Sequence, residues 1–185
     1  MNVYDFDNTI YKGDCTVDFW KHCIKKYPKT LFAFPSAVIL GMLFKLNLCK
    51  REQFKQQFYA FLKYVPDVQQ EVQLFWNSHI KKIKNFYKEQ KCSNDLIISA
   101  SPEFLIARAC KILGVQYIAS KVNITTGVLE SANCRGEEKV KRFQEQYPNE
   151  TIEKFYSDSM SDIFMAKKAK QAFLVRGDVI REWRI

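Results

Sequence analysis

Two hydrophobic patterns alternate along this chain. Short apolar runs, each followed by polar residues, predict β-strands before residue 5 and at 96–98, 115–119, 153–157 and 172–175. Between them, apolar residues recur at spacings of three and four, which predicts amphipathic helices at 103–113, 136–147 and 161–169. This alternation indicates an α/β fold with a mostly parallel sheet covered by helices on both faces, a Rossmann-like three-layer core.

A long helical block interrupts the alternation between residues 15 and 91. Apolar residues recur there at helical spacing, as at positions 54, 58, 61 and 62, and predict roughly four amphipathic helices. We therefore expect an all-α cap subdomain at 15–91, called the cap below, inserted into a core formed by 1–14 and 92–185. A Thr-Thr-Gly sequence within 121–130 predicts a strand pair or flap.

The composition is that of a folded globular protein, and the charge is unevenly distributed. With 185 residues, 47% of them apolar and 26% charged, the chain suits one domain, or a core with one inserted subdomain, and disorder is excluded. The net charge is +9, and the whole excess lies in the cap, where 13 Lys and 1 Arg face 5 acidic residues. Such a basic segment suits an anionic substrate, an anionic membrane surface or nucleic acid.

The longest apolar run, at 31–44, is too short to cross a membrane. As a helix it would extend about 21 Å, whereas the hydrocarbon core of a bilayer is about 30 Å thick. Lysines flank the run on both sides. The pattern therefore fits either a buried helix or helical hairpin, or a segment lying at a membrane interface.

The cysteines and histidines do not indicate a metal site. The six cysteines form no Cys-x-x-Cys pair, and only His22 and His79 could assist them, so zinc is not expected. The first residues read as a strand ending in acids and not as a secretory signal. This favours a cytoplasmic protein with reduced thiols.

Polar clusters follow three of the predicted strands. They are Asp5-Phe6-Asp7-Asn8-Thr9, Ser99-Ala100-Ser101 and the 157–162 segment with Asp158 and Asp162. In a parallel sheet these clusters meet at one edge, where crowded carboxylates repel each other unless a hard cation, most economically Mg²⁺, compensates them. One acidic pair alone has an ordinary explanation as a turn or helix cap, and Asp162 suits a cap. Three clusters together favour a site.

These clusters and Lys139 resemble, in the same order, the four motifs of the haloacid dehalogenase superfamily. The resemblance covers nearly the whole chain. The sequences Ile98-Ser99-Ala100-Ser101-Pro102-Glu103 and Gly136-Glu137-Glu138-Lys139 resemble the branch that contains the phosphoserine phosphatases. The helical block at 15–91 is placed like the superfamily's inserted helical cap.

The resemblance implies a Mg²⁺-dependent phosphomonoester phosphatase that works through an aspartyl-phosphate. Asp5 is the implied nucleophile and Asp7 the implied general acid and base. The backbone carbonyl of Asp7, with the carboxylates of Asp5 and Asp158, would hold Mg²⁺, and Asp162 would support the site from behind. The implied phosphate-binding residues are Thr9, Ser99, Ala100, Ser101 and Lys139. Whether Ser101 shares the role of Ser99 stays open.

Two positions depart from the superfamily pattern without removing a catalytic group. Asn8 replaces a common glycine, and Asn is the side chain that best tolerates a left-handed turn. Ser157 replaces the glycine that often precedes Asp158.

Substrate choice must come from the cap and from the loop after Asp7. Relatives that hydrolyse phosphoserine keep a cap arginine for its carboxylate, and Phe58 holds that position here, which disfavours phosphoserine. The basic, apolar cap resembles that of phosphatidylglycerophosphate phosphatases. One hypothesis is therefore a phospholipid head group, with peripheral binding to an anionic membrane at the inner face. The alternatives are a soluble phosphoserine-like, nucleotide or sugar phosphate, and a non-catalytic nucleic-acid-binding module.

Overall fold

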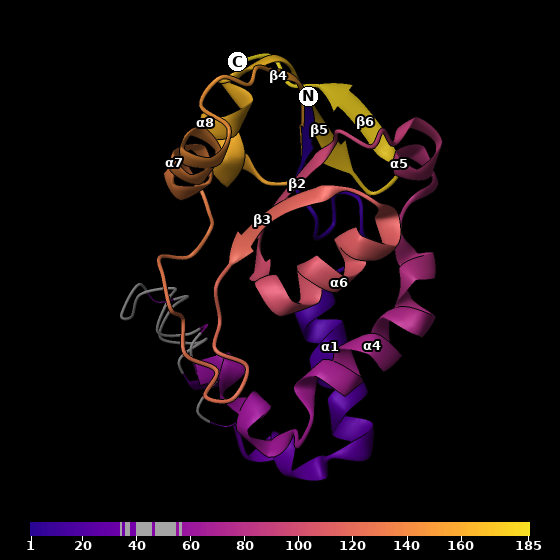
Figure 1. Cartoon of the computed structure of the whole chain (residues 1–185), viewed down its shortest axis with the longest axis vertical. Coiled ribbons are helices and arrows are strands. Elements are labelled where there is room, and N and C mark those ends of the chain that lie inside the picture. Colours follow the sequence, from indigo (N-terminus) through magenta and orange to yellow (C-terminus); the bar gives the residue numbers. More distant parts are fainter. Residues whose placement is uncertain (34, 36–37, 40–45, 47–54, 56) are drawn as a thin grey trace.

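A computed structural model describes residues 1–33, 35, 38–39, 46, 55 and 57–185. Its centre is a six-stranded sheet in the order β3-β2-β1-β4-β5-β6 (Figure 1). Strands β1 to β5 pair in parallel, and β6 runs antiparallel to β5. The strands are β1 (Asn2–Tyr4), β2 (Leu96–Pro102), β3 (Gln116–Ser120), β4 (Ile152–Ser157), β5 (Ala169–Arg176) and β6 (Val179–Glu182). The predicted α/β class and mostly parallel sheet are confirmed.

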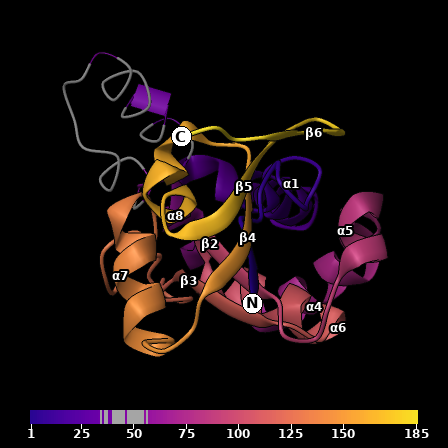
Figure 2. The same cartoon turned by 90° about the horizontal axis from the view of Figure 1, so that it is seen from above.

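Helices cover both faces of the sheet, because successive side chains of each strand point to opposite sides. Tyr4 and Ile97 belong to one buried cluster, together with residues of α6 (Glu103–Leu113) and α5 (Asn85–Gln90). Val3 and Ile98 belong to the other, with residues of α7 (Glu137–Gln146) and α8 (Ile163–Ala166). Figure 2 shows α7 and α8 on one side of β4 and β5, and α5 on the other.

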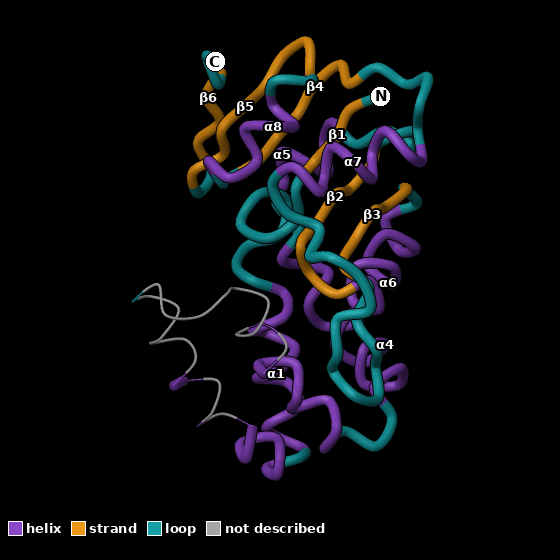
Figure 3. Tube along the Cα trace, turned by 90° about the vertical axis from the view of Figure 1, so that its left-hand side faces the viewer, coloured by secondary structure: helices purple, strands orange, loops and turns teal. Residues whose placement is uncertain are grey.

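The described part of the cap is helical and joins the core of the sheet. It contains α1 (Cys15–Lys26), η1 (Pro28–Ala33), η2 (Ala60–Tyr64), α4 (Val68–His79), η3 (Ile80–Lys82) and α5, where η denotes a 3₁₀-helix. Helices α1 and α4 extend away from the sheet (Figure 3). Trp76 of α4 donates a hydrogen bond to the Leu105 carbonyl of α6 at 2.9 Å, so the cap and the core share one continuous apolar cluster.

Two features of the structure differ from the prediction. The helix expected at 161–169 is only the short η4 (Met160–Asp162) and α8, because Ala169 already pairs with Ile152 in the sheet. Strand β6 was not predicted, and it follows the turn at Gly177. The 121–130 segment was predicted as a strand pair or flap, and it forms a flap with one isolated bridge, Val122 to Leu129.

Most of the apolar run at 31–44 lies outside the described residues. Within the described part, Phe32 is 71% exposed and Ile39 is 59% exposed, and Leu46, just past the run, is 66% exposed. No helix in the described residues is both long enough and apolar enough to cross a membrane.

The flap approaches the cap so closely that only glycine fits at its tip. Gly127 has φ +72°, and a Cβ there would lie 2.4 Å from the carbonyl oxygen of Tyr59. Gly114, which ends α6, has φ +70° but nothing within 4 Å of its Cβ position. The two glycines therefore share a left-handed backbone, and only Gly127 also faces a steric clash.

We predict that Gly127→Ala lowers the free energy of unfolding by about 2–4 kcal/mol, whereas Gly114→Ala lowers it by only about 1 kcal/mol. The difference reflects displacement of the flap from the Tyr59 backbone. Urea unfolding of both variants checks this, and equal losses would show that the flap does not press on the cap.

Candidate active site

The three polar clusters meet in one cavity of about 200 Å³ at the carboxyl ends of β1, β2 and β4. Its position is the one expected for a ligand site in a parallel α/β sheet. The lining residues are Asp5, Asp7, Asn8, Asp14, Lys55, Ser99, Ala100, Ser101, Arg135, Lys139, Asp158, Ser159, Ser161 and Asp162. All the predicted site residues except Thr9 are among them.

Lys139 joins two buried carboxylates at the back of the cavity. Its Nζ donates to Asp5 Oδ1 at 2.6 Å and to Asp162 Oδ2 at 2.7 Å. Burial alone would lower the pKa of the Lys139 ammonium, but the two carboxylates outweigh burial and raise it. Lys139 reaches this position because α7 begins at Glu137, directly after Gly136, and turns its first buried side chain toward the sheet.

Asp5 is a buried carboxylate, so its charge is costly to form. Burial raises the pKa of Asp5 to about 6, against the opposing pull of the Lys139 ammonium. Asp162 accepts a second hydrogen bond from the Ser157 hydroxyl at 2.8 Å, so this serine helps to fix the lysine's second partner. Ser157, which replaces a glycine common in the superfamily, thus takes part in the hydrogen-bond network around Lys139.

Thr9 lies behind the cavity and connects two of its carboxylates. Its buried hydroxyl lies 3.1 Å from Asp5 Oδ2 and 3.4 Å from Asp158 Oδ1, and it accepts the Asp158 N–H at 2.9 Å. Thr9 was predicted to bind phosphate, whereas the structure places it where it positions Asp5 and Asp158.

Asp7 is held by two short hydrogen bonds. Its Oδ1 accepts the Cys15 N–H at 2.6 Å, and its Oδ2 accepts the Ser101 hydroxyl at 2.5 Å. Burial, followed by the negative charge of Asp14, raises the pKa of Asp7 to about 7 despite these hydrogen bonds. A carboxyl group with this pKa can both donate and accept a proton near neutral pH.

The two serines at the end of β2 have different surroundings. The Ser99 hydroxyl accepts the Ser101 N–H at 3.0 Å, whereas the Ser101 hydroxyl is directed to Asp7. The neighbouring Ala100 carbonyl accepts hydrogen bonds from Lys55 at 2.8 Å and from Ser120 at 3.0 Å. The structure therefore separates Ser101, as a partner of Asp7, from Ser99.

Sequence reasoning missed several groups around the cavity. Asp14, Lys55 and Arg135 line it, but they lie in segments whose approach to the sheet depends on the tertiary fold. Buried Lys84 donates to the carbonyls of Asn8 and Gly177, both at 2.6 Å, and so ties the loop after Asp7 to the β5–β6 turn. Asn8 has φ +58°, which confirms the predicted left-handed turn.

The donor groups in the cavity suit a hard cation. In the described residues no three His, Cys, Asp or Glu side chains are arranged so that they could hold a metal ion by themselves, so a metal site needs a backbone oxygen as well. Asp5 and Asp158 both lie next to the Thr9 hydroxyl, and burial raises the pKa of each. Two carboxylates that are costly to ionise, with oxygen donors only, fit Mg²⁺ better than a softer metal.

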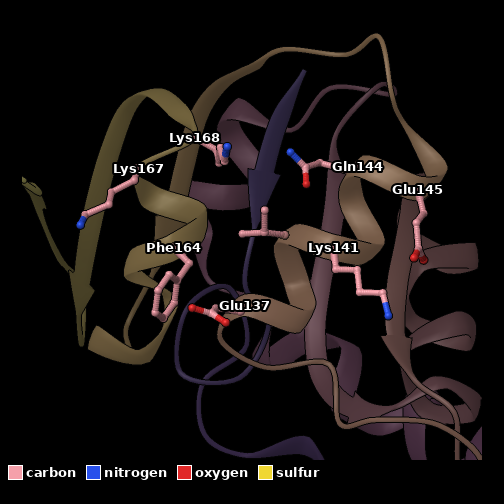
Figure 4. A pocket seen from close by; sticks show the side chains of 8 residues that line it. Glu137, Lys141, Gln144, Glu145, Phe164, Lys167 and Lys168 are labelled. Atoms are coloured by element: carbon pink, nitrogen blue, oxygen red, sulfur yellow. The ribbon is translucent and has the colours of Figure 1, made fainter.

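A larger open groove of about 720 Å³ lies between α7 and α8 (Figure 4). Its side chains include Glu137, Lys141, Phe164 and Lys168. It contains none of the predicted site residues, so its size does not mark it as the catalytic site.

The fold and the cavity define a Rossmann-like α/β protein with an acidic site at the carboxyl edge of its sheet. The sequence profile of the haloacid dehalogenase-like hydrolases matches residues 3–167. The chain therefore belongs to this hydrolase family. No curated protein sequence matches it significantly.

Solved structures show the same fold at low sequence identity. A protein of unknown function from Bordetella pertussis Tohama I matches with a TM-score of 0.76 and 17% identity, over 93% of this chain and 87% of that one. A phosphoserine phosphohydrolase-like protein from Francisella tularensis subsp. tularensis SCHU S4 has a TM-score of 0.58 and 17% identity, over 93% and 86%. A probable phosphoserine phosphatase from Vibrio cholerae has a TM-score of 0.67 and 13% identity, over 92% of this chain and 55% of that one.

The raised pKa of Asp7 predicts how stability depends on pH in the metal-free protein. A carboxyl whose pKa is higher in the folded than in the unfolded state stabilises the fold below its unfolded pKa, and this contribution is lost as pH rises through the folded value. Between pH 5 and pH 8, the raised pKa of Asp7 should lower the free energy of unfolding of the wild type by an amount on the order of 2 kcal/mol. Asp7→Asn should abolish this decrease and so flatten the pH dependence of unfolding.

Urea unfolding in the presence of a chelator measures this dependence. Glu89→Gln, at an exposed position, serves as the control and should keep the wild-type slope. An unchanged slope in Asp7→Asn would contradict the assignment.

Proposed function

We propose that this hydrolase is a phosphatase of phosphomonoesters, with Asp5 as nucleophile and Asp7 as general acid and base. One observation supports this most strongly. Asp5, bound to Lys139, and Asp7, whose pKa lies near neutrality, face the same small polar cavity. Two of the similar structures, a phosphoserine phosphohydrolase-like protein and a probable phosphoserine phosphatase, agree with the proposal.

In the first step a carboxylate oxygen of Asp5 attacks phosphorus. The bond from phosphorus to the alcohol oxygen breaks as the new bond to Asp5 forms, and protonated Asp7 gives its proton to the departing alkoxide. Lys139, with Ser99 and nearby backbone N–H groups, stabilises the charge on the transferring phosphoryl oxygens. The products are the free alcohol and an aspartyl-phosphate.

In the second step Asp7, now ionised, takes a proton from water, and the water oxygen attacks the phosphorus of the aspartyl-phosphate. The bond to Asp5 breaks, and inorganic phosphate leaves. Mg²⁺, held by Asp5, Asp158 and the Asp7 carbonyl, would neutralise charge between the nucleophile and the phosphate when bound. Lys139 keeps Asp5 oriented throughout through the 2.6 Å hydrogen bond.

A panel of phosphate esters with Mg²⁺ tests this proposal. We expect the wild type to release phosphate, and Asp5→Asn to lose at least about 10³-fold in kcat, because the amide cannot act as the nucleophile. Chelation should remove activity, and added Mg²⁺ should restore it.

Asp67→Asn is the matched control. Asp67 does not line the cavity, and it caps α4 by accepting the Gln70 N–H, a role that Asn fills equally well. It should keep wild-type activity. Failure of the wild type on every ester, or full activity of Asp5→Asn, would disprove the proposed function.

We further propose a phospholipid head group as the substrate, because apolar side chains and basic charge occur together on the cap. Phe32 and Leu46 are highly exposed, and Lys25 and Lys29 are exposed nearby in the sequence. Exposed apolar groups combined with lysines suit an anionic lipid surface. A soluble phosphomonoester is the alternative, and it requires no such surface.

Sedimentation with vesicles that contain anionic lipid distinguishes the phospholipid substrate from the soluble one. We expect binding at low salt, weaker binding at high salt, and at least about threefold weaker binding for Phe32→Ala. Phe164→Ala, which removes an exposed phenylalanine on α8, is the control and should bind like the wild type. No binding at low salt would exclude the lipid version.

A further inference from the structure

A second cavity of about 130 Å³ adjoins the catalytic one. The two share Asp14, Lys55 and Ser101 as lining residues, and the second cavity extends toward Val17, Phe58 and Tyr59. It therefore begins beside Ser101, the partner of Asp7, and continues along the first turn of α1. If phosphate occupies the catalytic cavity, the alcohol that Asp7 protonates points into this second space.

Tyr59 brings an unused polar group to that space. Its side chain is 2% exposed, and in the described part of the chain its hydroxyl has no hydrogen-bond partner. A hydroxyl on the wall of a cavity can exchange a hydrogen bond with a ligand that enters it. Burial, and then the negative charge of Asp14, raise the pKa of Tyr59, so the hydroxyl stays protonated and can donate.

The charged groups at the junction of the cavities make hydrogen bonds to other residues of the chain. The Lys55 ammonium donates to the Ala100 carbonyl at 2.8 Å and to Asn133 Oδ1 at 2.9 Å. Asp14 uses Oδ1 to accept the N–H groups of Thr16 and Val17, and it is exposed at the mouth. An ionic group placed between Val17 and Phe58 would lose its hydration, whereas a hydroxyl could pair with Tyr59.

We propose that Tyr59 is a specificity-determining residue, and that it binds a hydroxyl group on the alcohol of a small polyol phosphate. This inference rests on the proposed phosphatase function and adds the class of leaving group. The position of the flap supports it, because Gly127 lies against the Tyr59 backbone and holds this residue over the first turn of α1.

Two three-carbon esters, glycerol 3-phosphate and propyl phosphate, test the inference, because they differ only in hydroxyl groups. We expect wild-type kcat/KM to favour glycerol 3-phosphate by fivefold or more. Tyr59→Phe should reduce that preference about fivefold, the equivalent of one ordinary hydrogen bond, mainly through KM. Tyr64→Phe, at a 38% exposed position of the 3₁₀-helix that follows Tyr59, should keep the wild-type preference.

The outcomes distinguish the inference from the function on which it rests. Hydrolysis of both esters without a preference, or a preference that survives in Tyr59→Phe, would overturn the role of Tyr59 and leave the phosphatase intact. A higher kcat/KM for phosphoserine than for glycerol 3-phosphate would show that the second cavity accepts a zwitterion, which also overturns it. Failure to hydrolyse any ester, phenyl phosphate included, would overturn both.

Discussion

The buried ion pair between Lys139 and Asp5 is the interaction on which the rest of the site depends. A carboxylate and an ammonium that are both removed from water stabilise each other only when further hydrogen bonds complete the network. Here Asp162 accepts the second hydrogen bond of Lys139, and the Ser157 hydroxyl also donates to Asp162. The Thr9 hydroxyl donates to Asp5 from the other side. These residues lie in the loop after β1, in α7, at the end of β4 and in η4, so the parallel order of the sheet is what brings them together.

In the proposed function, selectivity comes from the groups that the loop before α1 and the cap add to the two cavities. Asp14 and Lys55 come from the start of α1 and from the cap, and Tyr59 joins them under the tip of the flap at Gly127. The core carries the groups that suit phosphoryl transfer, while the groups beside the leaving alcohol belong to the loop before α1 and to the cap. We associate the basic excess of the cap with approach to an anionic surface.

The sequence predicted those features that depend on local pattern or on a motif. Helix α6 matches its predicted bounds, because its apolar spacing is regular and Gly114 ends it. The predicted helix at 161–169 was too long, because pairing of Ala169 with Ile152 outweighed local helix propensity. The positioning role of Thr9 and the proposed role of Tyr59 could not be predicted from the sequence, because each depends on partners or cavities formed by residues distant in the chain. The choice of Lys139 as a site residue followed only from the family pattern, because α7 carries other basic residues such as Lys141, and its pairing with Asp5 was not predicted.

The central claim is that Asp5 accepts the phosphoryl group. Mixing the enzyme with a phosphate ester, quenching with acid within the first turnover and locating the added phosphate by peptide mass spectrometry tests this directly. The account predicts phosphate on Asp5, and none in Asp5→Asn. Phosphate on another residue, or a full turnover with no phosphorylated peptide, would contradict it.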